Sequence, residues 1–242
     1  MTTSLYQSAE RTKRMSTIPA VPPLRDGDRL TQTEFHRRYL AYPEDVKAEL
    51  IGGIVYIASP LRRPHGIYHP VLSYALCHYQ GVTPGVEVLD NATAILGPAS
   101  EPQPDLALRI LPEWGGRTHT AADDYVCGGS ELFAETAHST QALDLGPKRV
   151  DYQEAGVLEY IVLCIEPLEL HWFDLQTGQP IKPNRQGVYR SRVFPGLWLD
   201  REALFNRDTL RLLAVLQEGL ASRAHATFIK RLQAAHRKLT GG

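Results

Sequence analysis

The hydrophobic pattern of the first hundred residues predicts two helices around a β-hairpin. The segment Thr31-Gln32-Thr33-Glu34 has the spacing of a capping box and begins a helix over about 32–41. Two β-rich runs, 49–51 and 54–57, are separated by a pair of glycines and predict a hairpin. Apolar residues at helical spacing then predict a second helix over about 67–79.

The later apolar runs predict a mixed sheet. Strands are expected at 86–89, 92–96, 105–110, 132–136, 160–165, 169–175 and 188–193. A short helix over 147–155, closed by Gly156, stands between two of these strands, so the order strand, helix, strand occurs once. This order predicts an α/β fold whose sheet is mixed rather than all-parallel.

Three segments differ in composition. Residues 1–25 are rich in Ser, Thr and Arg, end in a cluster of prolines and predict a flexible N-terminal tail. Residues 26–200 carry the strand and helix signals of one core domain. Residues 201–242 contain leucines at helical spacing and a cap at Ser222, which predict a helical C-terminal extension for packing or dimer contacts.

The charged residues are also unevenly distributed along the chain. The 242 residues hold 26 Lys and Arg against 27 Asp and Glu. Both ends are basic, and residues 26–220 keep 17 basic and 26 acidic side chains, a net charge of −9. Because nucleic-acid binders usually show a basic balance, the acidic core argues against strong binding of nucleic acid by charge alone.

The sequence lacks several patterns, and their absence argues against some classes of protein. The longest apolar runs, such as 161–165, are far shorter than the roughly 18 residues of a membrane span. The sequence has no phosphate-binding loop and no glycine-rich dinucleotide motif, so no nucleotide cofactor is expected. Three widely spaced cysteines and a start without an apolar signal segment lead us to expect a cytoplasmic protein.

Three carboxylates stand beside apolar β runs. Asp105 precedes Leu-Ala-Leu, Glu135 follows Leu-Phe-Ala, and Glu49 opens the hairpin. A carboxylate held beside a core strand needs a cation or a hydrogen-bond partner. Converging carboxylates suit Mg²⁺ or Mn²⁺, and Lys148 on the following helix could orient a water or contact a phosphate.

These residues resemble the PD-(D/E)XK nuclease superfamily, in its branch of restriction endonucleases formerly known as a domain of unknown function. The resemblance covers about residues 28–200. It is carried, in family order, by Ala48-Glu49-Leu50-Ile51-Gly52-Gly53 with Ser59-Pro60 and His65, by Gln103-Pro104-Asp105-Leu106, by Leu132-Phe133-Ala134-Glu135 with Ser139-Thr140, and by Asp144, Lys148, Tyr152 and Gly156-Val157-Leu158-Glu159-Tyr160.

The resemblance implies a restriction-endonuclease-like core with flanking helices, and an endonuclease that hydrolyses phosphodiester bonds of DNA with Mg²⁺ or Mn²⁺. Asp105, Glu135 and the backbone carbonyl of Thr136 would be metal ligands, Glu49 would assist, and Lys148 would position the water or stabilise the transition state. Because cleavage of a duplex needs two active sites, a homodimer is expected.

Two positions depart from the family pattern. The usual lysine two residues after the acid is Ala137 here, so its role falls to Lys148 from the helix. The usual aspartate of the hairpin turn is Gly52. The first departure supports an alternative, a nuclease-fold protein that binds or assembles without efficient chemistry.

Other residues are candidates for contact with substrate. We expect Arg62, Arg63, His65 and Arg149 to contact the phosphates. His65 and His69 are four residues apart and would also suit zinc if one helix covers both, which leaves a zinc enzyme as a third hypothesis.

Overall fold

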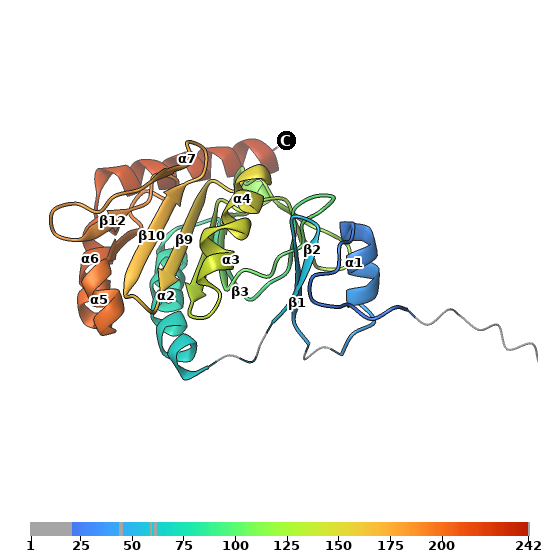
Figure 1. The fold of residues 1–242 in the computed structure, drawn as a ribbon. Coiled ribbons are helices and arrows are strands. Elements are labelled where there is room, and N and C mark those ends of the chain that lie inside the picture. Colours follow the sequence, from blue (N-terminus) through green and yellow to red (C-terminus); the bar gives the residue numbers. More distant parts are fainter. Residues whose placement is uncertain (1–20, 44–45, 59, 61, 242) are drawn as a thin grey trace, which may run out of the picture.

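A six-stranded mixed sheet forms the centre of the molecule (Figure 1). The computed structural model describes residues 21–43, 46–58, 60 and 62–241, so most of the predicted N-terminal tail lies outside the described residues. The strand order is β11-β10-β9-β8-β5-β3. The strands are β3 (Val86–Asp90), β5 (Leu106–Ile110), β8 (Leu132–Ala137), β9 (Glu159–Cys164), β10 (Glu169–Asp174) and β11 (Gln179–Pro180).

Strands β8 and β9 are the parallel pair of this sheet, and its other neighbours are antiparallel. A parallel pair needs a crossover connection, which α3 (Gln141–Leu145) and α4 (Pro147–Glu154) supply. The predicted order of strand, helix, strand is therefore present, and the α/β class with a mixed sheet is confirmed. The sequence pattern predicted α4 but not α3.

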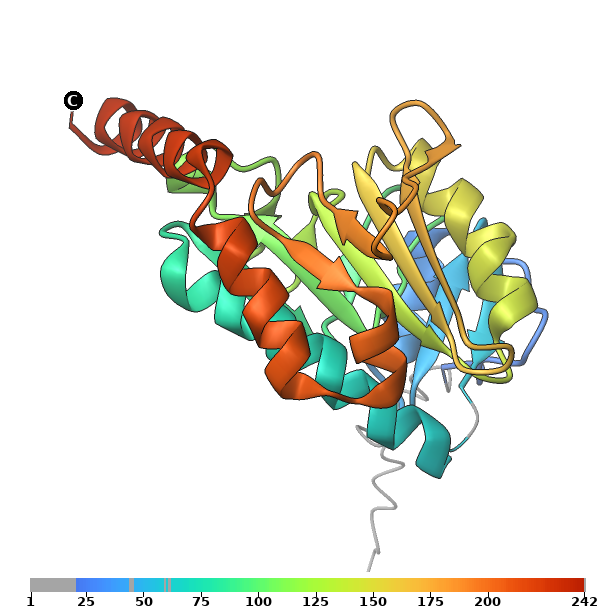
Figure 2. The same cartoon turned by 90° about the vertical axis from the view of Figure 1, so that its left-hand side faces the viewer.

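One face of the sheet is covered by α2 (Arg63–Val82) and the C-terminal helices α5 (Arg201–Asn206) and α6 (Thr209–Leu220) (Figure 2). Leu72 and Leu76 of α2 and Leu212 and Leu216 of α6 share one hydrophobic core with the sheet. The last helix, α7 (Arg223–Thr240), buries Phe228 and Leu232 in the same core. The C-terminal helices are thus part of the packed body.

Helix α2 is longer than the pattern predicted and contains Pro70 in its interior. Proline lacks a backbone donor and interrupts a helix locally. Buried residues stand on both sides of the proline, with His65 and His69 before it and Val71 and Leu72 after it. Packing thus supports the helix both before and after Pro70.

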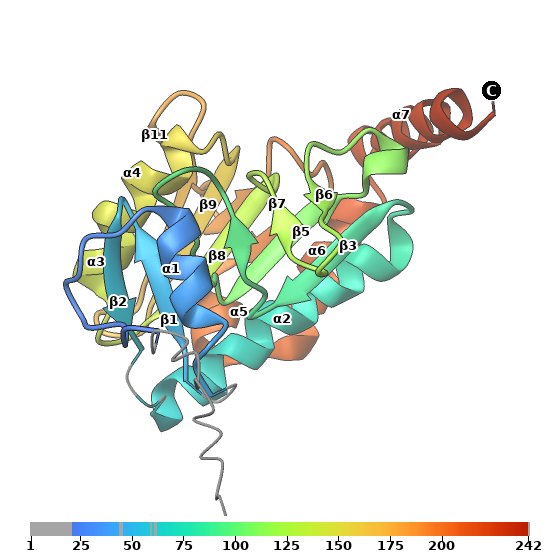
Figure 3. The same cartoon turned by 90° about the vertical axis from the view of Figure 1, so that its right-hand side faces the viewer.

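The opposite face carries the crossover helices and an N-terminal layer (Figure 3). That layer consists of α1 (Gln32–Tyr39) and the hairpin of β1 (Ala48–Ile51) and β2 (Ile54–Ile57). Smaller pairings are formed by β4 (Ala94–Ile95), β6 (His119–Thr120) and β7 (Val126–Cys127), and by β12 (Val188–Arg190) with β13 (Trp198–Asp200). None of the described helices combines the length and the apolar character needed to cross a bilayer.

The hairpin turn explains the glycine at position 52. Gly52 and Gly53 both have positive φ, 56° and 77°, which a two-residue hairpin turn of this kind requires. The Gly52 amide also donates to Asp151 Oδ1 of α4 at 3.1 Å. The turn therefore fixes β1, and with it Glu49, against the crossover helices.

Candidate active site

A cavity of about 930 Å³ opens where five elements meet. Its lining includes Glu49 from β1, Asp105 immediately before β5, Glu135 from β8, Asp144 from α3 and Lys148 from α4. Figures 1 and 3 both show the hairpin β1-β2 lying next to α3 and α4. The four residues proposed from sequence as catalytic thus line one cavity.

Strand register brings Asp105 and Glu135 together. Leu106 of β5 pairs with Ala134 of β8 in an antiparallel ladder, so the residues that flank this pair are neighbours. The Asp105 amide donates to Glu135 Oε2 at 3.3 Å, and the Thr136 amide donates to Asp105 Oδ2 at 2.7 Å. The two carboxylates are therefore fixed by backbone as well as by side-chain contacts.

Lys148 lies among the carboxylates. Its Nζ is 2.9 Å from Glu49 Oε1, 3.0 Å from Glu135 Oε1 and 3.7 Å from Asp144 Oδ1. The Lys148 residue is 4% exposed, so these contacts replace its hydration. Tyr152, one turn later on α4, donates from Oη to Glu135 Oε1 at 3.0 Å.

Burial and the charges of neighbouring groups together shift the pKa values of these residues. Burial is the main cause that raises the pKa of Glu135, and repulsion by Asp105, Asp144 and Glu49 adds to it although Lys148 opposes it. Burial also raises the pKa of Asp144 to about 6. Burial alone would lower the pKa of Lys148, but its attraction to Glu135, Glu49 and Asp144 raises that pKa well above its usual range.

The pKa of Asp105 is shifted in the opposite direction from those of Glu135 and Asp144. Burial acts to raise its pKa, but the hydrogen bond and charge of His65 and the amide of Thr136 outweigh burial and lower it. The His65 Nε2 atom is 2.9 Å from Asp105 Oδ2. Asp105 is therefore held as a carboxylate within the cavity.

The residues expected to contact substrate divide into two groups. Arg62 and His65 line the cavity. Arg63 is exposed at the start of α2 and is not part of the cavity lining. Arg149 donates from Nη2 to the Gly178 carbonyl at 3.1 Å and lies over the Phe173 ring, 4.2 Å from its centroid, so it points away from the cluster.

Some contacts of the lining residues carried no signal in the sequence. Lys47 Nζ donates to Asn91 Oδ1 at 2.9 Å, and Gln103 donates from its backbone to Glu49 Oε1 at 2.8 Å. These contacts join segments that are distant in the chain and follow from the fold alone. Asp144 could be found locally, since it stands four residues before Lys148 on the crossover.

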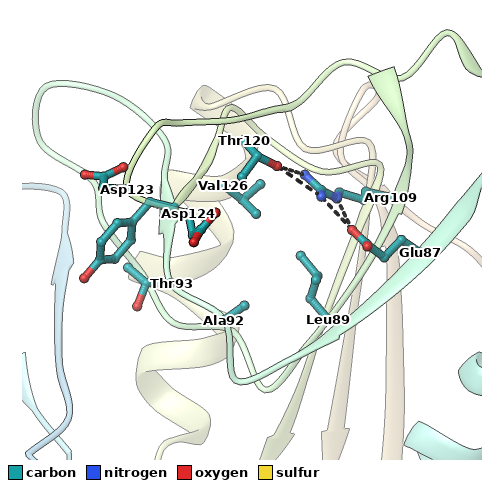
Figure 4. A pocket seen from close by; sticks show the side chains of 10 residues that line it. Glu87, Leu89, Ala92, Thr93, Arg109, Thr120, Asp123, Asp124 and Val126 are labelled. Carbon is teal, nitrogen blue, oxygen red and sulfur yellow. Dashed lines mark hydrogen bonds and ion pairs between the residues drawn. The ribbon is translucent and has the colours of Figure 1, made fainter. Parts of the chain in front are cut away.

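A second, smaller hollow of about 420 Å³ lies between β3, β5 and the segment 120–126 (Figure 4). Its arginine, Arg109, is 2.6 Å from Glu87 Oε2 and donates to Thr120 Oγ1 at 3.3 Å. Glu87 and Thr120 thus both pair with the Arg109 guanidinium, as the dashed lines in Figure 4 show. Asp123 and Asp124 also line the hollow, but Glu87 is already paired with Arg109.

Carboxylates on two adjacent strands, with a lysine on the crossover helix, define a restriction-endonuclease-like protein of the PD-(D/E)XK class. Residues 33–202 match the model of the family Uma2, described as "Putative restriction endonuclease". The match covers more than half of the chain, which therefore belongs to this family. The resemblance inferred from sequence is confirmed.

A solved structure shows the same fold. It is described as a "putative nuclease belonging to DUF820" from Anabaena variabilis, and it aligns with a TM-score of 0.57 at 10% sequence identity. The alignment covers 70% of this chain and 96% of that chain. A search of curated proteins found no match. The structural likeness at this identity supports the fold, and the family match supports a nuclease.

Proposed function

We propose that this chain is a divalent-metal-dependent endonuclease that hydrolyses phosphodiester bonds of DNA. The observation that carries the proposal is the buried cluster of Glu49, Asp105, Glu135 and Lys148, joined by contacts of 2.9 to 3.3 Å at one end of β5 and β8. The family match and the nuclease-like fold support the same class of reaction.

The residues of the cavity fit a hard divalent cation. Glu49, Glu135 and Asp144 contact the ammonium group of Lys148, and Asp105 adjoins Glu135, so four carboxylates lie together with one lysine. Carboxylate and carbonyl oxygens are the preferred ligands of Mg²⁺ and Mn²⁺. Asp105 and Glu135 would hold the ion, with Glu49 assisting.

The Thr136 carbonyl would be a further ligand. The Thr136 amide donates to Asp105, and the N–H and C=O of one strand residue point to the same side of the strand. Its carbonyl therefore faces the side on which Asp105 lies. A bound ion would supply an activated water and neutralise charge on the phosphate.

Side chains of the protein would supply the other roles in the proposed hydrolysis. Lys148, held between Glu49 and Glu135, presents a buried positive charge that would orient the attacking water and stabilise negative charge developing on the phosphate. Tyr152 fixes Glu135 Oε1. Arg62 at the cavity would contact the DNA backbone, which the acidic core otherwise repels.

The alternative of a nuclease-fold binding protein was supported by Ala137 and by the acidic core. Ala137 is buried in β8, whereas Lys148 Nζ reaches Glu135 Oε1 from α4 at 3.0 Å. A lysine is thus present beside the acids, which favours the active enzyme. Cleavage of both strands of a duplex would require two copies of the site, so we propose that the enzyme acts as a homodimer.

The test is cleavage of supercoiled plasmid and of single-stranded DNA with Mg²⁺, with Mn²⁺ and with EDTA. We expect nicking or cleavage that needs a divalent ion and falls at least 100-fold in Asp105→Asn and Glu135→Gln. Calorimetry with Mg²⁺ should show at least tenfold weaker binding in the same variants. Absence of cleavage with either ion contradicts the enzyme, and unchanged Mg²⁺ binding contradicts the site.

A further inference from the structure

We propose that His65, His69 and Asp105 form a second metal site, which binds a first-row transition ion of the class of Mn²⁺, Co²⁺ and Zn²⁺. The site adjoins the carboxylate cluster and shares Asp105 with it. The inference stands on the geometry of the two histidines, and it does not require that the chain cleaves DNA.

Helix α2 presents both histidines on one face. His65 and His69 are one turn apart, and their rings are stacked with centroids 5.3 Å apart and planes inclined by 16°. The two residues are 8% and 9% exposed. Their rings are therefore held by packing in nearly the same orientation, as metal-binding side chains must be.

The candidate ligand atoms lie close to one another. One ligand atom from each of His65, His69 and Asp105 lies within 4.8 Å of the others. The His65 Nε2 atom is 2.9 Å from Asp105 Oδ2. Two ligands bound to one ion at about 2.1 Å are about 3.0 to 3.4 Å apart. The pair of His65 and Asp105 is already near this spacing, and the His69 ring would move towards it to complete the set.

His69 also has unused bonding capacity. Its Nδ1 atom is buried and has no hydrogen-bond partner among the described residues. Its Nε2 atom is 3.3 Å from Asp90 Oδ2, and the Asp90 side chain is half exposed. Buried polar atoms are seldom left unpaired. The ring therefore has a nitrogen whose bonding capacity the described residues do not use, and Asp90 lies beside the ring where it would help to orient it.

The chemical types of the three ligands determine which ion the site prefers. Two imidazoles and a carboxylate favour borderline transition ions over Mg²⁺ and Ca²⁺, which prefer all-oxygen sites. Three protein ligands leave at least one position for a water or for an oxygen of the substrate. The site is thus open towards the cavity that His65 and Asp105 line.

The test uses the full chain, stripped of metal with EDTA, and Co²⁺ as the probe. Binding is followed by calorimetry and by the visible absorbance of Co²⁺, which changes when imidazole replaces water. We expect at least tenfold weaker binding and loss of this absorbance change in His65→Gln and in His69→Gln. His78→Gln, on the same helix but outside the cluster, should bind as the wild type does.

Glu135→Gln separates this site from the carboxylate site. We expect it to lose Mg²⁺-dependent cleavage and to keep the Co²⁺ absorbance change, because Glu135 is not a ligand of the histidine site. If the histidine variants do not fold, the melting temperature of Glu135→Gln is measured with and without Co²⁺, and a rise is expected. Co²⁺ binding unaltered by both histidine substitutions, or no rise in melting temperature, would overturn the proposal.

Discussion

Lys148 Nζ lies 3.0 Å from Glu135 Oε1, so the ammonium group of the crossover helix is paired with a carboxylate of a central strand. Both residues are almost fully buried. Glu49 and Asp144 contact the same ammonium group, and each contact comes from a different element. Lys148 therefore links the hairpin, the sheet and the crossover at one point.

Lys148→Met should impair both cleavage and stability. Loss of the ammonium group leaves Glu49, Glu135 and Asp144 buried without their cation, and breaking such a contact costs about 3 kcal/mol or more of unfolding free energy. The cleavage rate should fall at least 100-fold. The free energy is measured by urea unfolding in EDTA, and the rate is measured on plasmid at saturating Mg²⁺.

Arg149→Met is the matched control for this prediction. Arg149 is the next residue of α4, but its guanidinium contacts Gly178 and Phe173 rather than the cavity. We expect cleavage within about threefold of the wild type. Equal losses of activity in the two variants would show that the charge of α4 acts without the specific contacts of Lys148.

Asp144 should make stability depend on pH. Burial raises the pKa of Asp144 from 3.8 to about 6 in the folded chain. A carboxyl with a raised pKa contributes stability that is fully present below about pH 4 and is lost as pH rises through about 6. Between pH 4.5 and pH 7.5 this group should cost about 2 kcal/mol of unfolding free energy.

Asp144→Asn removes this titration, so the loss of stability between pH 4.5 and pH 7.5 should shrink by about 2 kcal/mol relative to the wild type. Urea unfolding in EDTA at the two pH values measures the difference. Glu154→Gln alters an exposed carboxylate on α4 and should leave the wild-type dependence unchanged. An identical pH dependence in Asp144→Asn and the wild type would contradict the prediction.

Arg62 and Arg63 allow a test of DNA contact at neighbouring positions. Both side chains belong to exposed residues, but Arg62 lines the cavity and Arg63 does not. Arg62→Gln should weaken DNA binding several-fold and reduce the slope of log affinity against log salt by about 1. Arg63→Gln should change neither quantity appreciably. Fluorescence anisotropy with labelled duplex DNA and catalytically inactive Glu135→Gln as background measures both.

Local sequence patterns predicted the elements that carry the acids, since the hairpin, β5, β8 and α4 each have their own apolar period or turn signal. They also predicted that Asp105 and Glu135 stand at the ends of core strands. The distances between them depend on the β5-β8 register and on the crossover, which no local pattern encodes.

Contacts between distant segments were harder to predict. Lys47 with Asn91, and the Gln103 backbone with Glu49, form only when the hairpin packs against the loop before β5. Arg149 was expected to contact the phosphates. Successive residues of a helix point about 100° apart, so Arg149 faces Phe173 instead of the cavity.

Two buried tyrosines next to the site differ in one respect that can be measured. Tyr152 and Tyr160 have ring centroids 5.0 Å apart and are both fully buried. Tyr152 Oη donates to Glu135 Oε1, whereas Tyr160 Oη has no hydrogen-bond partner in the part of the chain that the structure describes. Both hydroxyl groups were desolvated on folding, but only that of Tyr152 has an identified acceptor to offset this cost.

Replacement of each tyrosine by phenylalanine should therefore have different effects. Tyr152→Phe removes a hydrogen bond to a buried carboxylate and should lower the unfolding free energy by about 2 kcal/mol. Tyr160→Phe removes a hydroxyl that has no partner and should leave stability unchanged or raise it slightly. Both rings keep their aromatic packing, so urea unfolding in EDTA isolates the hydroxyl contribution. Equal losses in the two variants would mean that Tyr160 Oη has a partner, such as a buried water, and that the contact with Glu135 is not what distinguishes Tyr152.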